Sequence, residues 1–318
     1  MAASVPNLTL NDGVKMPVVG MGCFVGTRNI PENEMETVIN AFKSAIDLGY
    51  RHFDTAVLYN TETMLGAAIA AKVADGTVRR EDLFITTKLL MSDMRQERVV
   101  PALKASLSKL GLSYADNYII HWPSAITPDS TYEKGNIRFE DNVSFLDTWK
   151  AMEECKKLGL ARTIGISNFN RRQIQMILDN CTVKPSNNQC EVHVFFQNGK
   201  LREFCRQNGV AIVCYCPLAK QGVFPGAGIA ADPTLSSLAQ KYKRTNHQIA
   251  LRFLVQDGLV VIPHSSDPTY QLQNISLFDF TLSDDDMATV RALDKNTRLV
   301  DLAHLFGDGK EYPFREEY

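Results

Sequence analysis

The stretch that decides the fold prediction is Arg51-His52-Phe53-Asp54-Thr55-Ala56-Val57-Leu58-Tyr59, in which a short apolar run ends on chemically able side chains. Two later stretches repeat the pattern. Phe84-Ile85-Thr86-Thr87-Lys88 ends on a lysine, and Asn117-Tyr118-Ile119-Ile120-His121 ends on a histidine. In a barrel of parallel strands, the carboxyl ends of all strands open onto one face. We therefore predict that four side chains converge on that face: Asp54, Tyr59, Lys88 and His121.

Strand-like and helix-like segments alternate along the rest of the chain. Between the strand-like runs, apolar residues recur at helical spacing. Glycines at 49, 111 and 159 follow three of these helical stretches, where they suit helix C-caps. Eight strands with intervening helices predict an α/β protein with a closed (β/α)8 TIM barrel. The predicted strands lie near residues 17–22, 51–54, 84–88, 117–121, 162–166, 187–190, 211–215 and 259–263.

Several segments stand outside this repeat. A hairpin is predicted over residues 8–16, at the bottom of the barrel, because Asn11-Asp12-Gly13 tolerates the positive φ of a tight turn. Loops on the carboxyl-terminal face of a barrel commonly build the substrate site. Surface insertion without a role is the alternative interpretation of such loops. Long loops are predicted at about 124–144 and 219–234, and a C-terminal loop at about 297–318, within one barrel domain over residues 1–318.

Composition and charge exclude several classes of function. The chain has 318 residues, 45% of them hydrophobic, which is enough to bury a large core. Its formal net charge of −2 offers no electrostatic attraction to nucleic acid or an anionic membrane. No apolar run approaches the ~18–20 residues that span a bilayer, and no secretory signal is expected from residues 1–6. Seven cysteines without paired spacing predict free thiols and a cytoplasmic location.

The four strand-end residues suit proton transfer to an oxygen atom. Tyrosine has an ordinary pKa near 10, which a nearby ammonium lowers, and a carboxylate can hold that ammonium in place. Tyr59, Lys88 and Asp54 would form such a relay, while His121 could orient an incoming carbonyl oxygen. This suits carbonyl reduction, with a hydride supplied by a cofactor. Individually, Asp54 could instead cap a helix starting near Thr61, and Lys88 could extend toward solvent.

The later strand ends carry residues that suit a nicotinamide. Ser167 and Asn168 follow one predicted strand, and Gln189 and Tyr215 end the next two. A hydroxyl, two carboxamides and an aromatic ring offer hydrogen bonds to an amide and a surface for stacking. An Asn after a strand is otherwise usually a turn residue. The combination predicts a cofactor site.

The sequence indicates a phosphate-binding site less clearly than it indicates a nicotinamide site. Residues 20–26 resemble a dinucleotide-binding loop, but their spacing is G-x-G-x-x-x-G, and no strand ending in an acidic residue lies about 20 positions on. Asp47 falls in a helix-like stretch instead. Ser265 is a better candidate, because it precedes a helix expected from about Pro268, and helix N-termini bind phosphate.

These segments together resemble the aldo-keto reductase family, from about Leu8 into the tail. Its signatures match in order at residues 49–56, 120–123, 165–169 and 262–265, and the overall pattern is similar to insect members that reduce ecdysteroid 3-ketones and aldehydes. The resemblance implies NADPH-dependent carbonyl reduction without a metal, with Tyr59 as general acid in a catalytic set of Asp54, Tyr59, Lys88 and His121. It implies cofactor contacts from Gly22, Cys23, Phe24, Asp54, Ser167, Asn168, Gln189, Tyr215, Cys216, Pro217, Leu218, His264, Ser265, Tyr270, Gln273 and Asn274.

Departures from the family pattern concern both ligands. The family usually has lysine at His264 and arginine at Tyr270, so the grip on the 2′-phosphate of NADPH should weaken and NADH should be tolerated better. A serine is also commoner at Cys216. Leu90 and Phe24 stand where many relatives carry tryptophan. Leucine at 90 should widen the pocket, and the apolar residues around it favour a hydrophobic carbonyl substrate. The predicted substrate contacts are Phe24, Leu58, Tyr59, Leu90, His121 and Trp122.

Two other functions compete with a reductase. A non-catalytic cofactor-binding barrel of the same family is one, although such a protein has no need of Tyr59 beside Lys88. A metal-dependent barrel hydrolase is the other, but His121 and His193 lack close His-x-His spacing. We expect a monomer that binds a small carbonyl compound and no metal.

Overall fold

Eight parallel strands form the wall of a barrel in the computed structural model, which describes residues 5–26, 30–133, 135–219 and 228–316. Neighbours in the wall follow the order of the chain. The ring closes where Val261 donates its N–H to Val18 O (2.9 Å) and accepts from Gly20 (2.8 Å). The predicted (β/α)8 barrel is confirmed. Its strands are β3 (Met21–Gly22), β4 (His52–Asp54), β5 (Phe84–Leu89), β6 (Ala115–Ile120), β7 (Ala161–Ser167), β8 (Asn187–Glu191), β9 (Ala211–Tyr215) and β10 (Val260–Val261).

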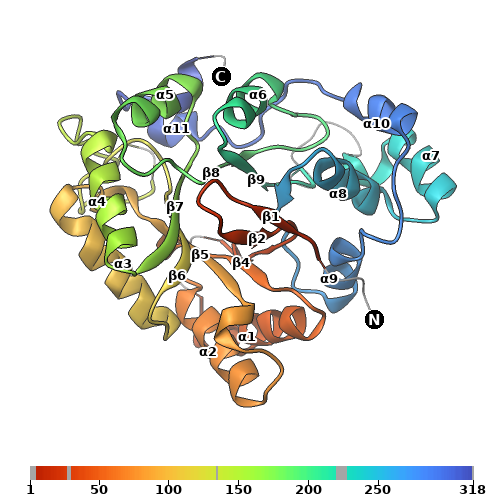
Figure 1. Ribbon diagram of the computed structural model, residues 1–318, viewed down its shortest axis with the longest axis horizontal. Helices are drawn as coiled ribbons and strands as arrows, with labels where there is room; N and C mark the ends of the chain where they lie inside the picture. The colour runs from red at the N-terminus through yellow and green to blue at the C-terminus, as the bar shows by residue number, and fades with distance from the viewer. Residues whose placement is uncertain (1–4, 27–29, 134, 220–227, 317–318) are drawn as a thin grey trace.

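Helices surround this wall (Figure 1). Their inner faces bury apolar side chains such as Phe42, Trp149 and Ile174 against the strands, in one core. Gly111, at φ +64°, ends α3 in the left-handed conformation that glycine adopts freely. The helices are α1 (Glu32–Asp47), α2 (Glu62–Ala74), α3 (Gln96–Leu110), α4 (Phe145–Lys157), α5 (Arg171–Asn180), α6 (Gly199–Gln207), α7 (Pro233–Tyr242), α8 (Asn246–Gln256), α9 (Pro268–Ile275), α10 (Asp284–Arg291) and α11 (Ala303–Phe306).

The predicted hairpin covers one end of the barrel. Strands β1 (Asn7–Thr9) and β2 (Lys15–Pro17) pair antiparallel around Gly13, at φ +84°. Leu10 and Met16 are buried against strand residues including Phe84 and Val260. In Figure 1 the hairpin lies across the middle of the ring, at the amino-terminal ends of the strands. This apolar contact closes the bottom of the barrel.

Two predicted strand boundaries were wrong. Residues 17–22 do not form one strand, because Pro17 belongs to the hairpin and only Met21–Gly22 pairs with β4, as strand β3. The backbone between them bonds first to Pro6 and then to Val261. The last strand, predicted over 259–263, is limited to Val260–Val261. Pro263 has no N–H to continue a ladder.

The three predicted loops contain local structure. The loop after β6 folds back on itself through an antiparallel bridge between Ile126 and Phe139. Of the loop predicted at 219–234, residues 220–227 lie outside the described part of the chain, and α7 begins within the remainder. The C-terminal segment holds α11 and a 3-10 turn at Pro313–Arg315, while 317–318 are not described.

The structure also bears on the expectations about the cysteines and about membrane-spanning segments. All seven cysteines are free thiols, as their spacing predicted. Among the described residues, no helix is both long enough and apolar enough to cross a membrane.

Candidate active site

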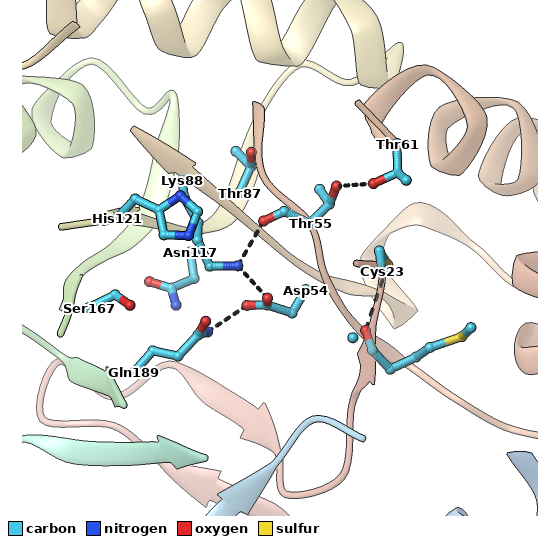
Figure 2. A network of polar contacts seen from close by, with 12 residues as sticks. Cys23, Asp54, Thr55, Thr61, Thr87, Lys88, Asn117, His121, Ser167 and Gln189 are labelled. Carbon is cyan, nitrogen blue, oxygen red and sulfur yellow. Dashed lines mark hydrogen bonds and ion pairs between the residues drawn. The ribbon is translucent and has the colours of Figure 1, made fainter. Parts of the chain in front are cut away.

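Lys88 lies at the centre of a buried polar network at the carboxyl-terminal ends of the strands (Figure 2). Its Nζ donates to Asp54 Oδ1 and, at 3.0 Å, to the carbonyl oxygen of Thr55. Neighbouring strands β4 and β5 bring these groups together. Both charged side chains are almost completely buried. A buried ammonium of this kind is tolerated because a carboxylate and a carbonyl satisfy it.

Tyr59 and His121 complete this network. Tyr59 is not at a strand end but in a 3-10 turn, Val57–Tyr59, that follows β4. The Lys88 Nζ lies 4.7 Å from the centre of its ring. The His121 imidazole meets the same ring edge to face, with the ring centres 5.6 Å apart. The structure therefore brings Asp54, Tyr59, Lys88 and His121 into one cluster.

Burial and neighbouring charges together shift the pKa values of three of these groups. Burial raises the pKa of Tyr59, and Lys88 lowers it by charge and hydrogen bonding, but the net pKa is above its ordinary value. The ammonium therefore lowers the tyrosine pKa as expected, but desolvation, which the sequence did not indicate, outweighs it. Burial lowers the pKa of Lys88, yet Asp54 and Tyr59 reverse this and the pKa is raised. Burial and Lys88 hold the pKa of His121 well below its ordinary value.

Asp54 does not cap the helix that follows it. Its second oxygen, Oδ2, accepts from Gln189 Nε2 at 2.6 Å. Thr61, the residue before α2, instead pairs its hydroxyl with that of Thr55 at 3.0 Å. The carboxylate of Asp54 is thus held between an ammonium and a carboxamide, which fix its orientation.

The ends of β7 and β9 form a neutral hydrogen-bonded group beside this network. Asn168, at φ +62°, donates from Nδ2 to His121 O and to Ser167 Oγ, both at 3.1 Å. Its Oδ1 accepts from the Tyr215 hydroxyl at 2.8 Å. The ring of Tyr215 remains partly exposed. Together with Gln189, these groups provide donors, acceptors and an aromatic face next to Asp54 and Lys88.

This set of groups fits a nicotinamide carboxamide. Such an amide presents both a carbonyl oxygen and an NH2 group, which hydroxyl and carboxamide side chains can match on either side. The first strand borders the same region, since Cys23 N donates to Asp54 O at 2.9 Å. Gly22 is needed there for packing, because a Cβ would lie 2.9 Å from Ile262 O. Phe24 follows and contacts Tyr59 edge to face at 5.0 Å.

The predicted contacts for the rest of the cofactor lie in two segments. Cys216, at φ +49°, begins the loop after β9 together with Pro217 and Leu218. The second segment, which joins β10 to α9, carries His264, Ser265, Tyr270, Gln273 and Asn274.

The details of this second segment bear on phosphate binding. His264 Nδ1 donates to Gly22 O at 2.8 Å, and Tyr270 is exposed. Asp267, rather than Ser265, caps α9 by accepting from Thr269 N at 2.7 Å. A carboxylate therefore already occupies part of the helix N-terminus proposed for phosphate.

The predicted apolar wall is only partly open. Phe24 is 47% exposed, and Leu58 and Leu90 are half-buried. Trp122 is only 4% exposed, because aromatic residues of the C-terminal segment cover it. Phe306 stacks on its indole with ring centres 5.3 Å apart, and Phe314 meets it edge to face at 5.6 Å.

Sequence reasoning missed residues that join this face to the C-terminal segment. Glu191, the last residue of β8, is fully buried and lies two positions after Gln189. The strand-end pattern that selected Asp54 and His121 could have found it. The aromatic residues at 306 and 314 carried no such signal, because they lie about 190 residues from Trp122 in the chain. No cluster of potential metal ligands occurs among residues that the structure describes.

Comparison with known proteins agrees with this geometry. The model of the aldo/keto reductase family matches residues 19–295. A Bombyx mori aldo-keto reductase, AKR2E4, is 40% identical over 98% of this chain and 99% of its own. Aldo-keto reductase family 1 member C1 of Pongo abelii is 42% identical over 97% of each chain.

Solved structures agree as well. That of the Bombyx mori enzyme in complex with NADP superposes with a TM-score of 0.88, at 38% identity, and covers 98% of this chain and all of the other. Aldose reductase of Schistosoma japonicum gives a TM-score of 0.89 at 36% identity over 98% and 99% of the two chains. The predicted resemblance to insect members is confirmed, and this chain belongs to the aldo/keto reductase family.

Proposed function

We propose that the protein reduces aldehydes and ketones to alcohols with NADPH, with Tyr59 as the general acid. The observation that supports this most directly is the position of Lys88, which contacts Asp54 on one side and Tyr59 on the other. When bound, NADPH supplies the hydride that no side chain can provide. Solved relatives in complex with NADP and NADPH support this choice of cofactor.

Each of the four residues has a distinct role in this proposal. Tyr59 keeps its proton at neutral pH, because its pKa, ordinarily near 10, is raised further by burial. As negative charge grows on the substrate oxygen, Tyr59 donates that proton, and Lys88 stabilises the phenolate that remains. Asp54 holds the ammonium in position. His121, neutral because of its lowered pKa, donates an N–H to the carbonyl oxygen.

The side chains around the cluster favour a hydrophobic substrate. Phe24, Leu58, Leu90 and Trp122 present apolar surface or support it, without a charged group among them. We propose a hydrophobic aldehyde, or a steroid-like 3-ketone of the ecdysteroid type, as the substrate. A panel of aldehydes, quinones and steroid ketones would rank these classes.

The preference for NADPH over NADH should be weaker here than in a protein with lysine at 264 and arginine at 270. His264 and Tyr270 carry no fixed positive charge for a 2′-phosphate, and His264 Nδ1 is engaged with Gly22 O. We expect NADPH to bind better than NADH by less than about a thousandfold, roughly 4 kcal/mol. Fluorescence titration gives both Kd values, and a larger ratio would contradict the proposal.

The substitution Tyr59→Phe tests the function itself. It removes the acidic hydroxyl and keeps the ring that packs on Phe24 and His121. We expect kcat for an aromatic aldehyde to fall by about 10²–10⁴-fold, the usual share of general acid catalysis. NADPH affinity should stay within about threefold, less than 0.7 kcal/mol. Unchanged turnover would refute Tyr59 as the acid, and a wild-type protein that binds NADPH without turnover would favour a non-catalytic barrel.

We further propose that residues 1–318 act as one domain and that the protein is a cytoplasmic monomer. Free cysteines support a reducing compartment. The mass in solution tests the monomer.

A further inference from the structure

Glu191 holds the C-terminal segment, here residues 297–316, against the barrel. The side chain is fully buried. Its Oε1 accepts from Leu299 N at 2.7 Å and its Oε2 accepts from Val300 N at 2.8 Å. His193 Nε2 lies 3.0 Å from Oε1 and donates a third hydrogen bond, since a carboxylate only accepts. Three donors therefore satisfy one buried carboxylate.

Neighbouring contacts strengthen this attachment. Thr297 N donates to Phe195 O at 3.4 Å. The Arg298 guanidinium lies between two rings, 3.6 Å from the centre of Phe314 and 4.6 Å from that of Phe196. Asn170 Nδ2 donates to Pro313 O at 3.0 Å. The C-terminal segment is thus attached near both of its ends to residues that follow β7 and β8.

The middle and end of this segment cover the substrate side. Phe306 and Phe314 both pack on Trp122, the residue directly after His121. Tyr312 belongs to the same apolar cluster. The segment that carries these rings is held at its start by Glu191 and near its end by Asn170 and Gln173.

We propose that Glu191 is a positioning residue for substrate selection: it fixes the C-terminal segment so that Phe306 and Phe314 shape the Trp122 side of the site. This inference rests on the proposed reductase function and concerns bulky hydrophobic carbonyl compounds. Glu191 does not touch the substrate, because its side chain is buried and its oxygens are occupied. A small aldehyde, which needs only the catalytic cluster, does not depend on it.

The substitution Glu191→Gln tests this with almost no change of size. Its carboxamide keeps one acceptor but turns an NH2 group toward Leu299 N–H or Val300 N–H, which opposes two donors. We expect KM for a bulky ketone to rise about tenfold, equivalent to about 1.4 kcal/mol. For a small aldehyde, kcat and KM should change by less than about twofold, and limited proteolysis should cut the C-terminal segment faster.

Two further variants make the result decisive. Glu316 lies in the same segment and forms an exposed ion pair with Arg172 of α5. Glu316→Gln removes that pair and should leave KM and kcat unchanged for both substrates. Phe306→Ala removes the ring that stacks on Trp122 and should reproduce the selective rise in KM for the bulky ketone. This variant still tests whether the segment shapes the site if Glu191→Gln fails to fold. An unchanged KM for the bulky ketone, or an equal loss on both substrates with a lower Tm, would overturn the inference. A wild-type protein that reduces no carbonyl compound would instead refute the proposed function and the inference with it.

Discussion

Two buried carboxylates, Asp54 and Asp116, sit at opposite ends of their strands and are paired in different ways. Asp116, the second residue of β6, accepts from Arg80 (2.7 Å), Arg162 (2.8 Å) and the backbone N–H of Ile85 (3.0 Å). Asp54, the last residue of β4, accepts from Lys88 and Gln189. Both are almost fully buried, yet their partners differ in what else they can do.

The difference lies in whether the cation is shared with a reacting group. Arg80 also donates to the carbonyl oxygens of Leu83 and Tyr114, so its guanidinium fixes backbone at the amino-terminal ends of the strands. Lys88 also donates to one carbonyl oxygen, that of Thr55, but unlike Arg80 it faces the ring of Tyr59. An ammonium of this kind can respond when the tyrosine changes charge. In the proposed mechanism, similar ion pairs thus serve structure at one end of the barrel and chemistry at the other.

The largest effect should follow the loss of the shared cation. Lys88→Met leaves Tyr59 without a charge that favours the phenolate, so we expect kcat to fall by about 10²–10⁴-fold. Steady-state kinetics with an aromatic aldehyde measures this. NADPH affinity, from fluorescence titration, serves as the control that the barrel is intact. A loss of less than tenfold would place Lys88 among structural residues like Arg80.

Asp116→Asn should have the opposite profile. It removes the negative charge that Arg80 and Arg162 share, although Arg162 is 46% exposed and can still be solvated. We expect the free energy of unfolding to fall by about 2–3 kcal/mol, below the usual cost of breaking a fully buried pair. Chemical denaturation measures it, with kcat staying within about twofold, less than 0.5 kcal/mol in the barrier. A loss of kcat at an unchanged free energy of unfolding would contradict the structural role that we assign to Asp116.

The smallest effect concerns two buried histidines, His121 on the catalytic face and His52 at the start of β4. Burial lowers the pKa of both, so the folded protein keeps them neutral where the unfolded chain takes up protons. Below the unfolded pKa of about 6.5, stability should therefore fall by up to about 1.4 kcal/mol per pH unit for each histidine. Denaturation between pH 7.5 and 5.5 measures the slope. His52→Gln should reduce it and His304→Gln, at an exposed site, should not; equal slopes in all three proteins would contradict this origin.

Local pattern was sufficient to predict most of the fold. Alternating apolar runs and helical periods predicted the eight strands, and Asn11-Asp12-Gly13 predicted the hairpin. The division of residues 17–22 between the hairpin and β3 was missed. The backbone partners of these residues are set by closure of the barrel and not by residue type. The extra structure within the C-terminal segment was missed for the same reason.

Side-chain chemistry at strand ends was also visible in the sequence. Asp54, Lys88 and His121 could be selected because parallel strands place their carboxyl ends on one face. The direction of the pKa of Tyr59 could not, since desolvation depends on how completely the folded protein covers the ring. Nor could the covering of Trp122 be foreseen, because Phe306 and Phe314 reach it from far along the chain.

By itself, the sequence determined a (β/α)8 barrel, the position of its polar strand ends and the type of reaction they suit. Those properties follow from period, residue type and strand direction, which are local. Only the tertiary structure decided that the pKa of Tyr59 lies above its ordinary value, that Gln189 holds Asp54, and that Glu191 attaches the C-terminal segment over Trp122. Each of these depends on burial or on contacts between residues distant in the chain, which no local pattern encodes.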